Sequence, residues 1–183
     1  MTPRSRAGTP AVRRTLLAVA VVLALSADDR NAGKVSDGRQ VIETAVAIVE
    51  TGSLGIAKGA PRAVEREDEA VSRYGLGASL AQLPAAFLAP FVEERLGAGS
   101  SQPLFLLASF AATLLAAGAA GAVARLAGAP AEAQSLAVLL AALGSPLGAY
   151  ATSDFSEALQ AAALAGALAF ALASARSGEP LAA

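Results

Sequence analysis

Apolar residues in this 183-residue chain gather in long blocks that polar segments separate. A helix that crosses a membrane needs about 20 mostly apolar residues. The blocks predict four transmembrane helices, at residues 12–27, 104–124, 133–150 and 156–174. We therefore expect an all-α, polytopic membrane helix bundle with cytoplasmic tails at residues 1–11 and 175–183, the second of them truncated.

The first block opens with arginines at positions 4, 6, 13 and 14, and Thr15–Ala27 is then almost purely apolar. This is the pattern of a cleaved signal peptide or of an uncleaved signal anchor. Ala24-Leu25-Ser26 offers a cleavage site. Because further apolar blocks follow, we favour the anchor.

Residues 28–103 form the longest polar stretch and are expected to be an extracytoplasmic loop with interfacial helices. Arg39–Thr51 has a broad apolar stripe, with charged residues on the other side, which predicts an amphipathic helix. Such a helix either lies in the membrane interface or forms part of the core of a small extracytoplasmic domain. The charge run from Lys58 to Arg73 predicts a solvated loop.

Tyr74–Val92 carries no charge, but Pro84 and Pro90 interrupt it. Proline removes a backbone donor and disfavours a helix interior, so we expect broken interfacial or re-entrant helices here. A full span is the alternative, and it would reverse the sidedness of everything after it.

Arginines near the ends of the apolar blocks predict the topology. The N-terminal arginines favour a cytoplasmic N-terminus. Alternating spans then place residues 28–103 outside, Arg125 and Arg176 inside, and Asp154 and Glu157 outside. Both short segments that are predicted to lie inside thus carry arginine, in agreement with the excess of positive charge in cytoplasmic loops.

Composition narrows the chemistry. The chain is 55% hydrophobic and 16% charged, has a net charge of −1, and contains neither cysteine nor histidine. Disulfides, Ser-His-Asp hydrolysis and imidazole or thiolate metal ligation are therefore excluded. The net charge also gives no indication of a basic surface that would bind nucleic acid.

Carboxylates at the predicted outer face are the candidate functional groups. Asp37 follows the first span, and Asp154 and Glu157 stand before the fourth. Carboxylates there could bind a cation or take a proton from a substrate hydroxyl. Asp37-x-x-Gln40 and Asp154-x-x-Glu157 also match a capping-box pattern, which gives the acids a purely structural reason to be present.

Three stretches resemble the outer loops of polyprenyl-phosphate-dependent membrane glycosyltransferases, the superfamily that includes the aminoarabinose transferases and the protein O-mannosyltransferases. The first loop of the family is similar to Ser36-Asp37-Gly38-Arg39 followed by Glu43 and Glu50-Thr51-Gly52. A later part of that loop resembles Arg73-Tyr74-Gly75-Leu76-Gly77. The second loop resembles Tyr150–Ala158.

The resemblance implies transfer of a sugar from a polyprenyl-phosphate donor to an extracytoplasmic acceptor glycan, lipid or protein, by a multi-pass protein of the bacterial plasma (inner) membrane. It implies that Asp37 is the catalytic base and that Arg73, Tyr74 and Glu43 bind substrate. Asp154, with Glu157 as second choice, binds a divalent metal ion or positions substrate.

Several departures bear on these expectations. Gly38 stands where the family commonly has a second acid, and four spans are fewer than the family has, so the chain resembles an N-terminal portion. The competing hypothesis is a non-catalytic polytopic membrane protein, a scaffold or transporter segment. A secreted domain with a cleaved N-terminus is a third, and the apolar run Leu104–Ala124 argues against it.

Overall fold

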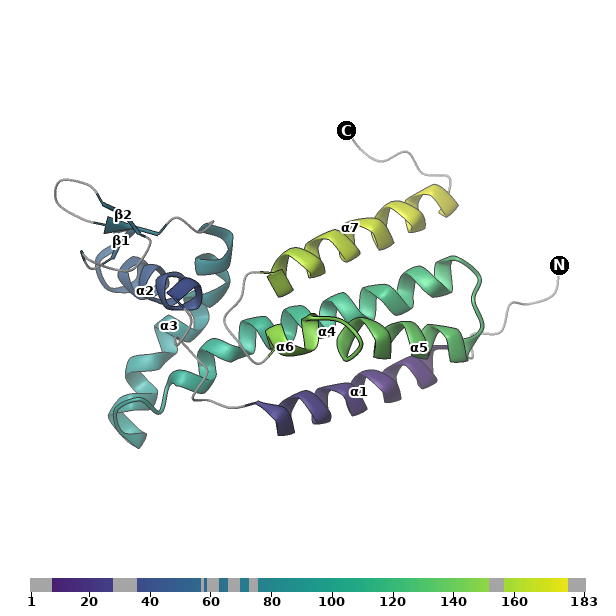
Figure 1. The fold of residues 1–183 in the computed structure, drawn as a ribbon, viewed down its shortest axis with the longest axis horizontal. Helices are drawn as coiled ribbons and strands as arrows, with labels where there is room; N and C mark the ends of the chain where they lie inside the picture. Colours follow the sequence, from purple (N-terminus) through teal and green to yellow (C-terminus); the bar gives the residue numbers. More distant parts are fainter. Residues whose placement is uncertain are drawn as a thin grey trace. The chain divides into compact units, whose positions relative to one another are not determined.

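The computed structural model describes residues 8–27, 36–56, 58, 63–65, 70–72, 76–151 and 157–177. The described part is mostly helical, with seven helices and three two-residue strands (Figure 1). The chain divides into two compact units. We call them the helical unit (Met1–Ser26, Ala111–Ala149 and Glu157–Ala183) and the sheet unit (Ala27–Phe110 and Tyr150–Ser156).

Three of the described helices are long and apolar enough to cross a membrane: α3 (Leu76–Leu96), α4 (Gln102–Leu126) and α7 (Glu157–Ser177). The length and composition of these three helices suggest a multi-pass membrane protein. Helices α4 and α7 lie over the predicted spans 104–124 and 156–174. The 19-residue α1 (Gly8–Ser26) lies over the predicted first span, but it is not among these three helices.

Helix α3 differs from the sequence-based expectation. Pro84 and Pro90 both lie inside one continuous helix of 21 residues, where we expected broken helices. A proline removes one backbone donor, and a membrane-associated helix tolerates this loss because its other hydrogen bonds remain and its neighbours support it. The two prolines therefore do not divide the segment.

The predicted span 133–150 is divided in the structure. Helix α5 (Ala131–Ala142) ends before Gly144, and the five-residue α6 (Leu147–Ala151) follows. Pro146 explains the break, because proline disfavours helical conformation in the residue before it and cannot donate its own bond. The Ser145 hydroxyl donates to the Ala141 carbonyl near the end of α5. At 12 residues, α5 is shorter than the roughly 20 that a straight span needs.

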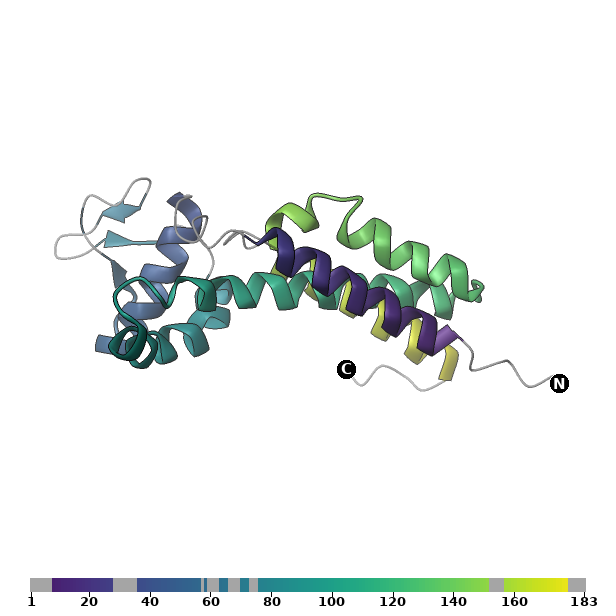
Figure 2. The ribbon, with the colours of Figure 1, turned by 90° about the horizontal axis from the view of Figure 1, so that it is seen from below.

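The helical unit packs through narrow stripes of small and branched residues. Helices α1, α4 and α5 run side by side in both ribbon views (Figures 1 and 2). Their buried residues recur at helical spacing, as close packing of helices in lipid requires. They are Val19 and Leu23 of α1, Ala112, Thr113, Ala116 and Ala117 of α4, and Gln134, Val138 and Ala142 of α5.

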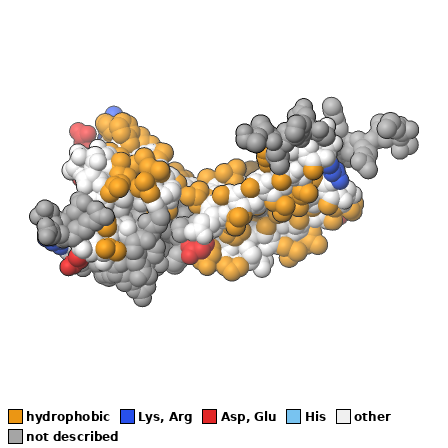
Figure 3. All heavy atoms as spheres, turned by 90° about the horizontal axis from the view of Figure 1, so that it is seen from above, with side chains coloured by type: hydrophobic (Ala, Val, Ile, Leu, Met, Phe, Trp, Pro, Cys, Tyr) orange, Lys and Arg blue, Asp and Glu red, His pale blue; other side chains and the backbone are white. Residues whose placement is uncertain are grey.

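Helix α7 contributes little to this packing. Only 6% of its most apolar window is buried, and Leu164, Leu168 and Phe170 are among its exposed side chains. Hydrophobic side chains spread widely over the surface of the helical unit (Figure 3). Because exposed apolar patches of this extent are unusual in soluble proteins, the surface fits a lipid environment.

A tight turn joins α4 to α5. Gly128 has a φ of +83°, and the Ala129 amide donates to the Ala124 carbonyl over 3.0 Å. Glycine in the left-handed region with a hydrogen bond of this span is the usual way for a helix to end. Pro130 then precedes α5. The turn holds the end of α4 beside the start of α5.

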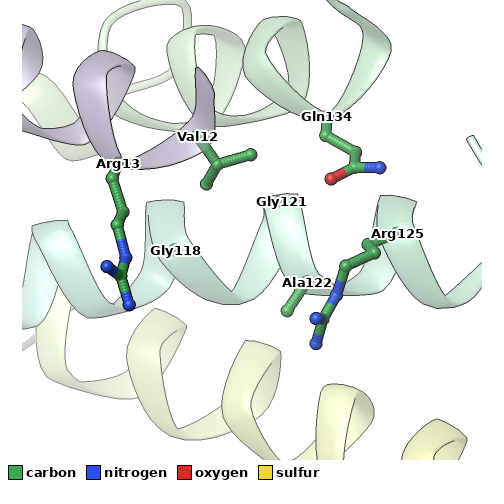
Figure 4. A pocket seen from close by; sticks show the side chains of 7 residues that line it. All are labelled: Val12, Arg13, Gly118, Gly121, Ala122, Arg125 and Gln134. Atoms are coloured by element: carbon green, nitrogen blue, oxygen red, sulfur yellow. The ribbon is translucent and has the colours of Figure 1, made fainter. Parts of the chain in front are cut away.

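A pocket lies at this end of the helical unit. It has a volume of about 190 Å³, and its lining comes from α1, α4 and α5 (Figure 4). Arg13 of α1 and Arg125 of α4 contribute its charged groups, and Gln134 comes from α5. The start of α1 and the end of α4 therefore lie at the same level.

The sheet unit has its own core. Helix α2 (Ser36–Thr51) packs against α3, and the core forms around Ala45, three alanines of α3 and Phe105. Ile42 and Val46 pack at its edge. The apolar face of α2 is thus covered by another helix of the chain, as the domain-core interpretation of Arg39–Thr51 required.

The all-α prediction missed a small antiparallel sheet. Strands β1 (Gly55–Ile56), β2 (Val64–Glu65) and β3 (Ala70–Val71) pair in the order β1-β3-β2. Gly55 is opposite Val71 on one side of β3, and Val64 is opposite Val71 on the other. Strands β2 and β3 lie within Lys58–Arg73, where we expected a solvated loop, and β1 lies just before it. The sequence did not predict them because a strand of two residues is too short to carry the alternating pattern that predicts strands.

Candidate functional site: the acceptor stripe of helix α2

Three polar residues share one face of α2. Gln40, Glu43 and Thr44 are spaced by three and four positions, which places them together on a helix. Gln40 is only 1% exposed and Thr44 only 4%. We call these three residues the acceptor stripe. The core residues Ile42, Ala45 and Val46 occupy a different face, so the stripe is not part of the apolar contact with α3.

Glu43 is held by an ion pair along its own helix. The Arg39 Nε donates to Glu43 Oε1 over 2.7 Å, and the Arg39 side chain is 66% exposed. An exposed helix pair of this kind contributes only about 0.3–0.5 kcal/mol. Its consequence here is orientation, because it fixes one carboxylate oxygen and determines where the other one lies.

The second oxygen of Glu43 is buried without a hydrogen-bond partner among the described residues, and the same holds for the Thr44 hydroxyl oxygen. Leaving such an atom unsatisfied costs about 1–3 kcal/mol. Two such atoms on consecutive residues are unusual in a folded protein. A ligand that donates hydrogen bonds would remove the cost.

Asp37, the predicted catalytic base, is in the first turn of α2, three positions before Gln40. Helical register therefore puts position 37 in line with the acceptor stripe. A carboxylate in the first turn complements the helix dipole. The capping-box hypothesis places Asp37 at the start of the helix, whereas α2 begins one residue earlier, at Ser36. The Asp37 side chain lies outside the described residues.

The structure describes few of the other predicted site residues. Arg73, Tyr74 and Asp154 lie outside the described residues. Glu157 is exposed in the first turn of α7, within the helical unit, whereas Glu43 belongs to the sheet unit. Tyr150 and Ala151, which precede Asp154, belong to the sheet unit with α2.

The described residues include no group of three or more acidic residues that could hold a metal ion. The predicted ligand Asp154 lies outside the described residues, so the metal role of Asp154 and Glu157 stays a sequence-based prediction.

Sequence reasoning missed Thr44 and Gln82 as candidate polar groups. Gln82 of α3 is buried, and its amide Nε2 donates to the Phe105 carbonyl over 2.9 Å. Its Oε1 has no partner among the described residues. The available signal was the spacing of uncharged polar residues within apolar helices, which is weaker than a cluster of acids.

No protein-family model, no curated protein and no solved structure matches the chain.

Proposed function

We propose that the chain belongs to a membrane glycosyltransferase that takes a sugar from a polyprenyl-phosphate donor at the outer face of the bacterial plasma membrane. The observation that carries the proposal is the acceptor stripe, in which Glu43 Oε2 and Thr44 Oγ1 are buried and lack donors among the described residues. A sugar presents a row of hydroxyl donors, which is the complement of such a stripe.

The donor lipid is accommodated in the same unit. An apolar cavity of about 240 Å³ lies between α3 and the first turns of α4. Pro84, Leu88, Leu104 and Leu107 are part of its lining, and Gln82 is its polar member. A hydrocarbon chain is favoured in such a space because it removes apolar surface from water.

The position of the arginines supports an outer location for the sheet unit. Arg13 and Arg125 line one pocket, so the start of α1 and the end of α4 lie at one end of the helical unit, which we assign to one membrane face. The arginine-rich N-terminus favours the cytoplasm for that face. The start of α4 then lies outside. We therefore propose that the chain between α1 and α4 makes no net crossing, and that α3 lies at the outer surface although it is long enough to span.

The transfer step follows from the resemblance of the loops. The acceptor hydroxyl attacks the anomeric carbon of the sugar, and its proton passes to the Asp37 carboxylate as general base. The bond between the anomeric carbon and the phosphate oxygen breaks, and polyprenyl phosphate leaves. Arg73 offsets the phosphate charge through a charge-assisted hydrogen bond, with Tyr74 beside it.

Binding of the sugar is the direct test. The purified chain would be incubated with a short-chain polyprenyl-phosphate hexose, and the fraction bound would be measured by native mass spectrometry. Replacing a charged or hydroxyl acceptor by Glu43→Gln or Thr44→Val removes a bond worth about 1–3 kcal/mol, so we expect roughly tenfold weaker binding. Asp37→Asn should abolish transfer in membranes while the protein still inserts.

Two controls make the test specific. Glu50→Gln removes an exposed carboxylate from the same helix and should leave binding unchanged. Polyprenyl phosphate without a sugar should bind all variants equally, since it has no sugar hydroxyls to donate. Equal binding of the sugar donor by Glu43→Gln, Thr44→Val and the unaltered chain would contradict the proposal.

One observation favours the alternative of a non-catalytic scaffold. Helix α7 leaves nearly its whole apolar surface exposed, which suits association with other membrane helices. Under that alternative the acceptor stripe binds no sugar, and the same measurement separates the two functions.

A further inference from the structure

The pocket at the end of the helical unit combines features that the proposed sugar transfer does not use. Its floor is apolar and small, formed by Val12, Gly118, Gly121 and Ala122, and two arginines stand at its edge. Gly121 also lets α4 approach α1 and α5 closely. A Cβ on Gly121 would come within 3.6 Å of Val12 Cγ1 and 2.8 Å of Val138 Cγ2.

Gln134 gives the pocket a defined polar group. The side chain is 6% exposed, and its Nε2 donates to the Ala129 carbonyl over 2.8 Å. This bond fixes the amide, and its Oε1 is buried with no partner among the described residues. Figure 4 shows this oxygen on the side of the amide that faces Val12, with the nitrogen on the other side. The pocket therefore presents one hydrogen-bond acceptor.

The charge in the pocket is positive. Arg13 and Arg125 are exposed, and neither has an ion-pair partner within the described ranges. In Figure 4 both guanidinium groups extend to the same side of α4. Guanidinium groups bind phosphate oxygens with two parallel hydrogen bonds, so the pair suits a phosphate group.

We infer that this pocket binds the headgroup of a membrane phospholipid whose phosphate contacts Arg13 and Arg125 and whose amine or hydroxyl group donates to Gln134 Oε1. Basic pockets between membrane helices at the cytoplasmic face bind anionic headgroups by the same physics. The volume of about 190 Å³ equals roughly six water molecules at ~30 Å³ each, enough for a phosphate with a short polar extension.

A lipid is favoured over a soluble phosphate ester by the surroundings. The floor of the pocket is apolar, and α1 and α4 continue from it as apolar helices. The acyl chains of a bound phospholipid would lie against these helices, and a free phosphate ester would leave them uncovered.

Lipid competition tests the inference. The purified chain would be given equal amounts of phosphatidylethanolamine, phosphatidylglycerol and phosphatidylcholine with identical acyl chains, and bound lipids counted by native mass spectrometry. The choline headgroup has no N–H or O–H, so it cannot donate to Gln134 Oε1. We expect phosphatidylethanolamine and phosphatidylglycerol to exceed phosphatidylcholine, and Gln134→Leu to remove this preference. Equal retention of the three lipids by the unaltered chain would overturn the inference.

The arginines have a matched control in the same helix. Arg13→Gln with Arg125→Gln should lower total bound phospholipid by more than tenfold, because two charge-assisted bonds are lost and the loss of one alone weakens binding about tenfold. Arg14→Gln removes the same charge next to the pocket and should change nothing, since Arg14 does not line it. An equal loss of bound phospholipid with Arg14→Gln would show that surface charge alone explains the binding, and it would overturn the inference. Displacement of the lipid by excess inorganic phosphate would identify a soluble phosphate as the ligand and overturn it as well.

Discussion

The two units of the chain bury polar side chains differently. The helical unit buries Thr113 and Gln134, while the sheet unit buries six of the eight buried polar residues in the described part of the chain. The helical unit instead packs through alanine, glycine and valine, as expected of helices in lipid, where a polar atom without a partner is costly. The sheet unit buries more polar groups, and Gln40 and Thr44 of the acceptor stripe are among them.

The largest expected effect concerns which side of the membrane each end of α4 faces. Ala98 and Ala127 are exposed residues in the turns before and after α4. In a chain without cysteine, Ala98→Cys should react with an impermeant thiol reagent on intact cells, and Ala127→Cys should not. Labelling of Ala127→Cys but not of Ala98→Cys would mean that α3 crosses the membrane. The start of α4 would then lie inside the cell and its end outside, which contradicts the proposed topology.

The part of the fold that follows from long apolar blocks was predictable from the sequence. The blocks that became α1, α4 and α7 are apolar over whole turns, so the sequence alone locates them. The end of α5 at Ala142 and the continuity of α3 through Pro84 were not predictable. A proline breaks one helix and is tolerated in another, and the outcome depends on packing around the lost hydrogen bond rather than on the proline itself.

The candidate site was predictable only in part. Glu43 carried a signal because it is a charged residue on an amphipathic helix. Thr44 and Gln82 carried only the weaker signal of uncharged polar residues within apolar helices, because their burial is a property of tertiary packing. The pocket between α1, α4 and α5 brings together residues more than a hundred positions apart. Arg13 stood out only as part of the charged start of the first apolar block, and Gln134 did not stand out.

Close packing in the helical unit predicts the next effect. An added Cβ at Gly121 would lie 2.8 Å from the Cγ2 of Val138, which is fully buried and cannot move aside. Gly121→Ala should therefore lower the melting temperature in detergent, since overpacking costs about 1–3 kcal/mol against a gain of about 1 kcal/mol in helix propensity. A shift of about 2–4 °C per kcal/mol is expected for a chain of this size.

Glycines elsewhere in the same unit serve as controls. A Cβ added to Gly166 of α7 would have no atom within 4 Å, and one added to Gly118 would have its nearest neighbour 3.8 Å away. Gly166→Ala and Gly118→Ala should leave the melting temperature unchanged or raise it slightly. A loss of stability in all three variants would show that glycine is needed for helix flexibility, and the packing explanation would fail.

The smallest effects concern single hydrogen bonds, one in each unit. Thr113 Oγ1 donates to the Leu147 carbonyl over 3.3 Å, and Gln82 Nε2 donates to the Phe105 carbonyl over 2.9 Å. Distance alone predicts that Gln82→Leu is the more damaging, because the shorter bond is lost. However, Gln82→Leu also removes the buried Oε1, whose burial costs about 1–3 kcal/mol against about 1 kcal/mol for the bond.

We therefore expect Gln82→Leu to destabilise the chain no more than Thr113→Val, measured as the change in melting temperature in detergent. The result separates two reasons for polar burial in the sheet unit. If Gln82 were retained for stability, its replacement would lower the melting temperature clearly more than Thr113→Val. If Gln82 is retained to bind a ligand in the cavity between α3 and α4, Gln82→Leu should leave the melting temperature nearly unchanged and should weaken ligand binding. We expect this second result, because the acceptor stripe of the same unit also has buried polar atoms without partners among the described residues.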